Sequence, residues 1–101
     1  MATVEVEIVG VIDEDFPGWV ECHLTDANDQ VHVFREKIPV VIDSALDALA
    51  NFPRKGVIRC TVLEMQSDVL VIDTELPDGV ESISGITRFA VSPDQITGVE
   101  P

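Results

Sequence analysis

Apolar and polar residues alternate through the segment Thr3–Ile12, which reads TVEVEIVGVI. The apolar residues from Val4 to Ile8 fall on one face of an extended chain, and the glutamates between them fall on the other. This period of two predicts a half-buried β-strand. Beyond Ile8 both faces are apolar and Gly10 interrupts the run, so we expect a bulge or a bend where the strand enters a more enclosed region.

Five further segments are bounded by turn residues and carry the apolar, β-branched residues typical of strands: Trp19–Asp26, Val31–Arg35, Gly56–Met65, Asp68–Thr74 and Ile86–Val91. The first two form a predicted hairpin, and the next two form a second hairpin that turns at Gln66-Ser67. Val69–Ile72 is apolar on both faces, which makes it the best candidate for a central strand.

One short helix is predicted at Ala45–Phe52, with a polar capping residue before it and Pro53 at its end. A helix of this length is not stable alone in water, so it should pack against the strands. The preceding segment, Ile38–Ile42, is predicted to be an apolar connector, because its proline excludes a central strand position. Ser92–Gln95 combines the serine cap, proline and glutamine that begin a one-turn helix.

The expected order of elements is three strands, a short helix and three more strands, in a single domain of residues 1–101. A chain of this length can bury a core without disulfides or metals. We therefore predict a mainly β fold, β or α+β, built as a small six-stranded barrel with the helix between the third and fourth strands. The OB-fold matches this order best, and an SH3-like barrel or a rolled sheet with one helix is the alternative.

The first hairpin has a register that the turn residues predict. Asn28 and Asp29 tolerate the positive φ that tight hairpin turns require. If these two are the central residues of the turn, Leu24 lies opposite Val33.

The same register places His23 and His32 on one face of the hairpin, with Glu21 beside them and Phe34 opposite His23. Diagonal neighbours on paired strands are close enough for long side chains to meet. Two imidazoles and a carboxylate could bind Zn²⁺ with water in an open position. The alternative is that both histidines pack near Phe34 on a half-exposed face.

Asp and Glu number 19 against 6 Lys and Arg, so the net charge is −13 and the sequence pI is about 4.1. Such a surplus of anions repels nucleic acids and anionic membranes and attracts basic proteins or cations. Single-strand binding by an OB-fold needs a basic groove with stacking aromatics, whereas this chain has 4 Phe, 1 Trp and no Tyr. Solubility alone is the competing explanation of the acidity.

A turn of acidic residues, Asp13, Glu14 and Asp15, is flanked by Phe16 and Trp19. Aromatic side chains beside charged residues are typical of the centres of protein interfaces. We therefore expect these five residues to be a protein-binding site for a basic partner. The alternative is that Trp19 covers one end of the barrel.

The standard patterns of catalytic and cofactor-binding sites are absent from the sequence, and we expect no catalytic residue and no cofactor. A second loose group of carboxylates comprises Asp73, Glu75, Asp78 and Glu81. Carboxylates in solvated turns have no environment that separates their pKa values, so this group is expected to be a solvated face.

Two cysteines, Cys22 and Cys60, lie far apart in predicted strands. We expect two buried, reduced thiols, and a disulfide between them is the alternative if their strands are neighbours. The amino-terminal segment has neither the basic region nor the apolar run of a signal peptide, and no run of residues is long enough to cross a bilayer. A cytoplasmic protein is therefore expected.

Residues 15 to 41 read DFPGWVECHLTDANDQVHVFREKIPVV. The FPGW sequence, the ECHLTDA segment and the EKIPVV connector resemble a stretch found in short uncharacterised bacterial proteins. The resemblance covers about a quarter of the chain and contains no catalytic motif. It implies a bacterial, cytosolic origin and no particular activity, ligand or site.

Three functions follow from these observations. The leading hypothesis is a non-enzymatic protein-binding module, for example an inhibitor or immunity-type protein for a basic partner such as a nuclease, whose cleft the acidic turn would cover in place of phosphate. The second is a metal-dependent or small-ligand enzyme that uses the face of His23 and His32. The third is a self-associating domain, in which edge strands pair across the two-fold axis of a homodimer. An OB-type nucleic-acid binder is a further alternative, which the negative charge disfavours.

Overall fold

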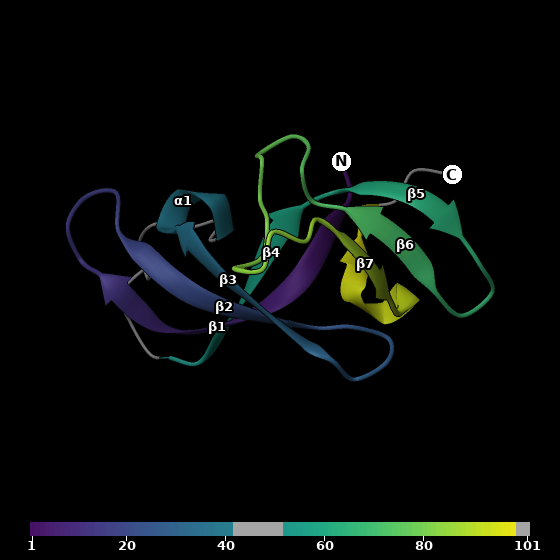
Figure 1. Ribbon diagram of the computed structural model, residues 1–101, viewed down its shortest axis with the longest axis horizontal. Helices are drawn as coiled ribbons and strands as arrows, with labels where there is room; N and C mark the ends of the chain where they lie inside the picture. The colour runs from purple at the N-terminus through teal and green to yellow at the C-terminus, as the bar shows by residue number, and fades with distance from the viewer. Residues whose placement is uncertain (42–51, 99–101) are drawn as a thin grey trace.

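Two antiparallel sheets account for most of the chain, and one short helix follows the third strand of the larger sheet (Figure 1). The structure is a computed structural model that describes residues 1–41 and 52–98. The elements are β1 (Thr3–Asp13), β2 (Trp19–Thr25), β3 (Val31–Lys37), α1 (Ile38–Val41), β4 (Arg54–Arg59), β5 (Thr61–Met65), β6 (Leu70–Asp73), β7 (Arg88–Val91), the 3-10 turn Pro93–Gln95 and β8 (Ile96–Thr97).

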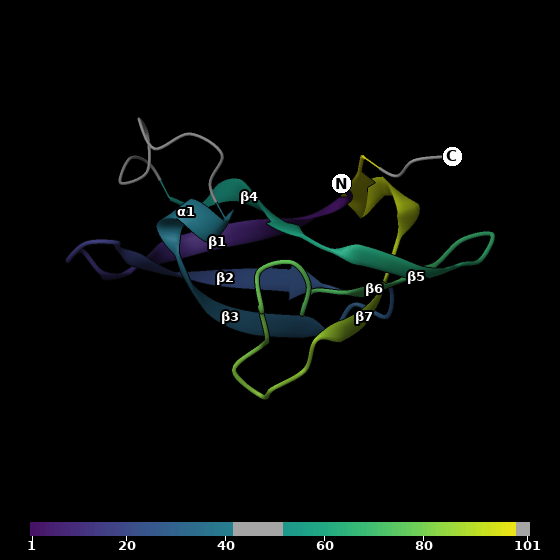
Figure 2. The same cartoon turned by 90° about the horizontal axis from the view of Figure 1, so that it is seen from above.

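The larger sheet has the order β3-β2-β1-β4, with β8 also paired to β1, and the smaller sheet has the order β5-β6-β7 (Figure 2). The mainly β prediction is confirmed. The described residues form eight strands rather than six, because the segment Gly56–Met65 breaks at Cys60 into β4 and β5 and because β8 is an additional short strand. These strands belong to two sheets and do not close a barrel within the described ranges, so the six-stranded barrel is not confirmed.

The core lies between the two sheets and is lined by the inward side chains of β1, β2 and β3 on one side and of β6 and β7 on the other. Phe34 on β3 is fully buried, and its ring centre lies 5.6 Å from that of Phe89 on β7. This aromatic pair joins the two sheets. The largest other side chains with no exposed surface are Ile8, Leu24, Ile58 and Ile72.

The β2–β3 hairpin has a different register from the predicted one. Leu24 lies opposite His32, not Val33, and His23 lies opposite Val33, not Phe34. The reason is the loop. The N–H of Asp26 donates to the carbonyl of Gln30 at 2.9 Å, which leaves a three-residue loop instead of a two-residue turn.

Asp29 occupies the last position of this loop with a φ of 63°, in the left-handed region. A type I turn followed by one left-handed residue is a common three-residue hairpin loop. One extra loop residue shifts β3 by one position, and a shift of one moves every side chain of the strand to the other face. Phe34 therefore enters the core instead of the histidine face.

Several local predictions are confirmed. A bulge lies between Ile8 and Gly10 on β1, and β6 is the central strand of its sheet. The N–H of Ser92 donates to Oε1 of Gln95 at 2.9 Å, as expected of a capped turn. The predicted helix at Ala45–Phe52 lies outside the described residues except for its last position.

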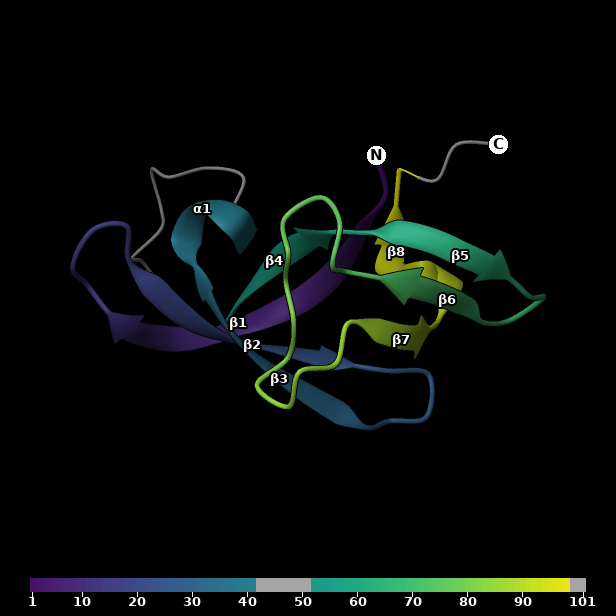
Figure 3. The same ribbon diagram turned by 45° about the horizontal axis from the view of Figure 1, so that its top comes forward.

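Helix α1 occupies part of the predicted connector and rests on β4 at a glycine. A Cβ on Gly56 would lie 2.7 Å from the carbonyl oxygen of Val41 and 2.5 Å from Cδ1 of Ile8. Only glycine therefore allows the helix backbone to approach the sheet this closely. The approach fixes α1 beside the base of the β1–β2 turn (Figure 3).

Candidate functional site

The turn between β1 and β2 carries the predicted acidic and aromatic residues at one end of the molecule (Figure 1). The side chains of Asp13, Glu14 and Asp15 are exposed, and Phe16 is 98% exposed. The N–H of Asp15 donates to Oδ1 of Asp13 at 2.9 Å, and the N–H of Gly18 donates to the carbonyl of Asp15 at 2.7 Å. These bonds define the turn while leaving the Phe16 ring in solvent.

The base of the turn is anchored to the start of α1. Gly18 is buried and has a φ of 83°, and its carbonyl accepts the N–H of Ile38 at 2.9 Å. A Cβ at this position would lie 2.6 Å from Cδ1 of Ile38, a residue that is itself buried. The backbone conformation and the close contact both require glycine. The turn is thus held at its base and free at its tip.

Trp19 lies at the first position of β2, opposite Asp13 on one side and Lys37 on the other. It is half-buried, and Nζ of Lys37 lies 5.8 Å from the centre of its ring, within the range of a cation–π contact. Trp19 is therefore part of the support of the turn. The exposed aromatic surface of the predicted site comes from Phe16.

The second group of predicted carboxylates differs from the turn because two of its members are paired. Asp78 accepts two hydrogen bonds from the guanidinium of Arg59, one of them 2.9 Å long. Asp73 Oδ2 lies 3.3 Å from Nε of Arg88. Planar arginine pairs of this kind neutralise the carboxylates that they contact. The β1–β2 turn is therefore the less compensated of the two acidic regions.

Three of the four remaining cations also make an interaction in the part of the chain that the structure describes. Nζ of Lys55 lies 3.4 Å from Glu5, Lys37 lies over Trp19, and Arg54 makes an interaction of its own. Arg35 stands directly opposite Glu21 on the neighbouring strand. The Lys and Arg side chains are thus spread among carboxylates, and the hollow that Arg54 and Lys55 line also contains Glu5 and Glu7.

The predicted histidine site is wrong in its geometry, because the hairpin register separates its members. His23 and Glu21 lie on the outer face of β2, where Nε2 of His23 is 2.9 Å from Oε2 of Glu21. His32 lies on the inner face with Leu24. Across the described ranges, no group of three or more His, Cys, Asp or Glu residues has the geometry to hold a metal ion.

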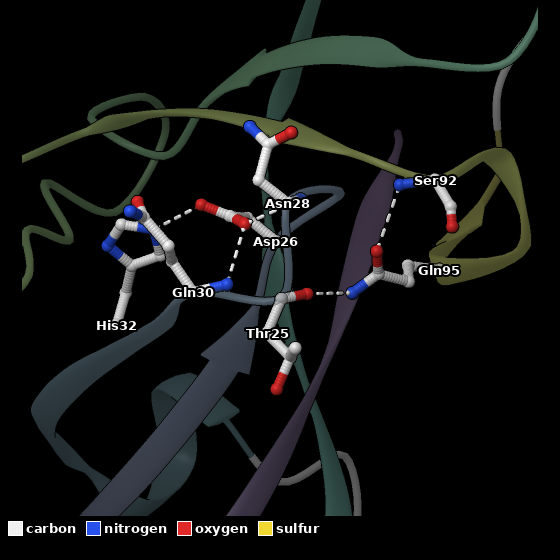
Figure 4. Close-up of polar contacts among 7 residues, drawn as sticks. All are labelled: Thr25, Asp26, Asn28, Gln30, His32, Ser92 and Gln95. Atoms are coloured by element: carbon white, nitrogen blue, oxygen red, sulfur yellow. Dashed lines mark hydrogen bonds and ion pairs between the residues drawn. The ribbon is translucent and has the colours of Figure 1, made fainter.

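His32 instead forms a hydrogen-bonded cluster with Asp26 and the loop of the β2–β3 hairpin, which the sequence did not predict (Figure 4). Its Nε2 lies 2.8 Å from Oδ2 of Asp26, and its ring packs edge-on against Phe89 with 4.8 Å between ring centres. Oδ1 of Asp26 accepts the backbone N–H groups of Asn28 and Gln30 at 2.8 and 3.0 Å. One carboxylate thus holds the three-residue loop and ties it to the histidine.

We expect Asp26→Ala to lower the free energy of unfolding by about 1–3 kcal/mol, because three hydrogen bonds lose their shared acceptor. Burial alone would raise the pKa of Asp26, but the hydrogen bond with His32 and those from the Gln30 and Asn28 N–H groups lower it below the ordinary value. Denaturant unfolding of both proteins measures the difference. Asn28→Ala is the matched control and should have little effect, since the exposed Asn28 contributes its backbone here.

The lowered pKa fixes the pH dependence of this difference. The stability that Asp26 contributes is fully present above its ordinary pKa of 3.8 and is lost as the pH falls through the lowered value. The difference in the free energy of unfolding between the wild type and Asp26→Ala should therefore be constant above pH 3.8 and should shrink as the pH falls further. A gap that grows on acidification would contradict this assignment.

Both cysteines are free and buried, as predicted. Burial raises the pKa of Cys22 to about 12, with the charges of Glu36 and Glu21 adding to the effect, and burial raises that of Cys60 to about 11. Because the thiolate is the reactive form, neither sulfur is a nucleophile at neutral pH. These residues belong to the core.

Comparisons of the chain with protein-family models, with curated proteins and with solved structures gave no match. The resemblance to short bacterial proteins therefore stays a prediction. Within the described ranges, no helix combines the length and the apolar character needed to span a membrane.

Proposed function

We propose that this protein is a non-enzymatic binding module that docks its β1–β2 turn onto a basic surface of another protein. An inhibitor or immunity-type protein for a basic enzyme, such as a nuclease, is the form of this function that we favour. The observation that carries the proposal is the Phe16 side chain, which is 98% exposed at the tip of a turn whose neighbouring side chains are carboxylates.

The exposure of Phe16 favours binding because a large apolar ring gains free energy when it leaves water. Rings of this kind act as anchors at the centres of interfaces, surrounded by polar contacts. Here Asp13, Glu14 and Asp15 would supply these contacts. The turn is also preorganised by its bonds to Gly18 and Ile38, which reduces the conformational entropy lost on binding.

The charge of the chain favours a basic partner. The net charge is −13, and Lys55, Arg59 and Arg88 are paired with carboxylates while Lys37 lies over Trp19. A field of one sign speeds the approach of a partner of the opposite sign and disfavours nucleic acids. The cytoplasmic location, the bacterial origin and an OB-like arrangement of the two sheets are parts of the same proposal.

The proposal predicts that Phe16→Ala abolishes capture of a basic protein from a native cell extract. Leu76→Ala is the control, because Leu76 is also an exposed apolar residue, at 67%, but lies between β6 and β7. Immobilised wild-type protein and Leu76→Ala should retain a protein rich in Lys and Arg at low salt and less of it at moderate salt. The proposal would be contradicted if all three proteins retained equal amounts of the basic protein, or if the amount retained did not depend on the salt concentration.

A further inference from the structure

A groove of about 460 Å³ is lined by β5. This strand lies at the end of the molecule away from the β1–β2 turn (Figures 1 and 3). Every residue from Cys60 to Met65 lines it, together with Met1, Ala2 and Gly98. Successive side chains of a strand point to opposite faces of its sheet. Consecutive residues can all line one groove only when the groove follows the edge of the strand.

This edge is free in the described chain. Strand β5 is the terminal strand of the β5-β6-β7 sheet, and β6 is its only strand partner among the described residues. An edge strand presents a row of N–H and C=O groups that can pair with another extended chain. The side of the groove formed by β5 therefore offers main-chain groups of alternate residues for hydrogen bonding.

Two apolar side chains of this strand are exposed. Leu63 is 46% exposed and Met65 is 66% exposed, and both line the groove. Added strands gain affinity from the main chain and specificity from contacts with alternate side chains. Leu63 and Met65 are available for apolar contacts with an added strand, and methionine adapts readily to different partners.

A second copy of this chain fits the edge poorly. The second copy would carry the same net charge of −13, so the two chains would repel each other. Its Glu64 would also lie in the same paired strands as the first Glu64. The ladder between β5 and β6 also has an irregularity between Val62 and Glu64, which bends the strand. Two rigid bent edges do not match, whereas an extended segment of another protein can follow the bend.

We propose that the outer edge of β5 binds an extended segment of a partner protein, carrying alternating basic and apolar side chains, as an added strand. The apolar side chains contact Leu63 and Met65, and the basic ones lie near Glu64. This site goes beyond the proposed docking of the β1–β2 turn and does not depend on it, since the two lie at opposite ends of the molecule (Figure 1).

A labelled peptide in which Lys and Val alternate provides the test, with a Glu–Val peptide of equal length as the charge control. Fluorescence anisotropy should show binding of the Lys–Val peptide alone. Leu63→Asp should weaken this binding by about tenfold or more. Ile12→Asp is the matched control, because Ile12 is 47% exposed on a strand at the other end of the molecule, and this variant should bind normally.

Amide hydrogen exchange locates the peptide. Saturating Lys–Val peptide should slow exchange in residues 61–65 of the wild type and of Phe16→Ala alike. Glu64→Lys is a second variant, at an exposed position, that tests the site even if Leu63→Asp unfolds. It should weaken binding of the Lys–Val peptide and strengthen binding of the Glu–Val peptide. Equal binding of both peptides, protection elsewhere, or a homodimer that already protects β5 in the free protein would overturn the proposal.

Discussion

Phe34→Ala is expected to lower the free energy of unfolding by about 3–5 kcal/mol. Phe34 has no exposed surface, lies opposite Cys22 on the neighbouring strand and contacts Phe89 across the space between the sheets. Its removal leaves a cavity where the two sheets meet. Since a domain of this size has a stability of about 5–15 kcal/mol, the variant should lose a large share of its stability.

Phe16→Ala is the matched control for this prediction, because it makes the same chemical change in a ring that is 98% exposed. Denaturant unfolding should give this variant the midpoint of the wild type. If the two variants unfolded at the same denaturant concentration, Phe34 would not join the sheets, and the register described for β2 and β3 would be wrong.

The second large effect is expected on the rate of association with the basic partner. Lysine at positions 13, 14 and 15 reverses the charge around Phe16. Electrostatic steering raises association rate constants by about 10- to 1,000-fold. We therefore expect the charge reversal to lower the association rate constant by about tenfold or more. Stopped-flow measurement at low salt gives this rate, and the difference from the wild type should narrow as salt rises.

The control is a variant with the same change in net charge made elsewhere. Asp68, Glu75 and Glu81 are exposed carboxylates outside the β1–β2 turn, and lysine at these positions alters the field of the whole molecule equally. The turn variant should slow association much more than this control does. Equal slowing by both variants would show that the net charge acts alone and that the turn has no special role.

Features that depend on neighbouring residues could be predicted from the sequence. The alternation around Val4 and the interruption at Gly10 predicted the first strand and its bulge, because both depend on local backbone geometry. The acidic turn was also predictable, since Asp, Pro and Gly favour turns and charged side chains remain in water. The structure places these carboxylates and Phe16 on the surface.

Features that depend on one residue of register could not be predicted. The loop around Asp29 is compatible with either a two-residue or a three-residue connection, and only the second brings His32 to Asp26. The break of the strand at Cys60 has no signal in the segment Gly56–Met65, which contains no proline and no glycine after its first residue, because the break arises where the chain leaves one sheet for the other. The groove along β5 follows from that break.

Photo-crosslinking from position 16 tests the central claim most directly. A benzophenone side chain in place of Phe16 should form an adduct with a protein rich in Lys and Arg in a native cell extract, and lysine at positions 13, 14 and 15 should abolish it. The same group in place of Leu76 should give no such adduct. Absence of an adduct from position 16, or the same adduct from both positions, would contradict docking through the β1–β2 turn.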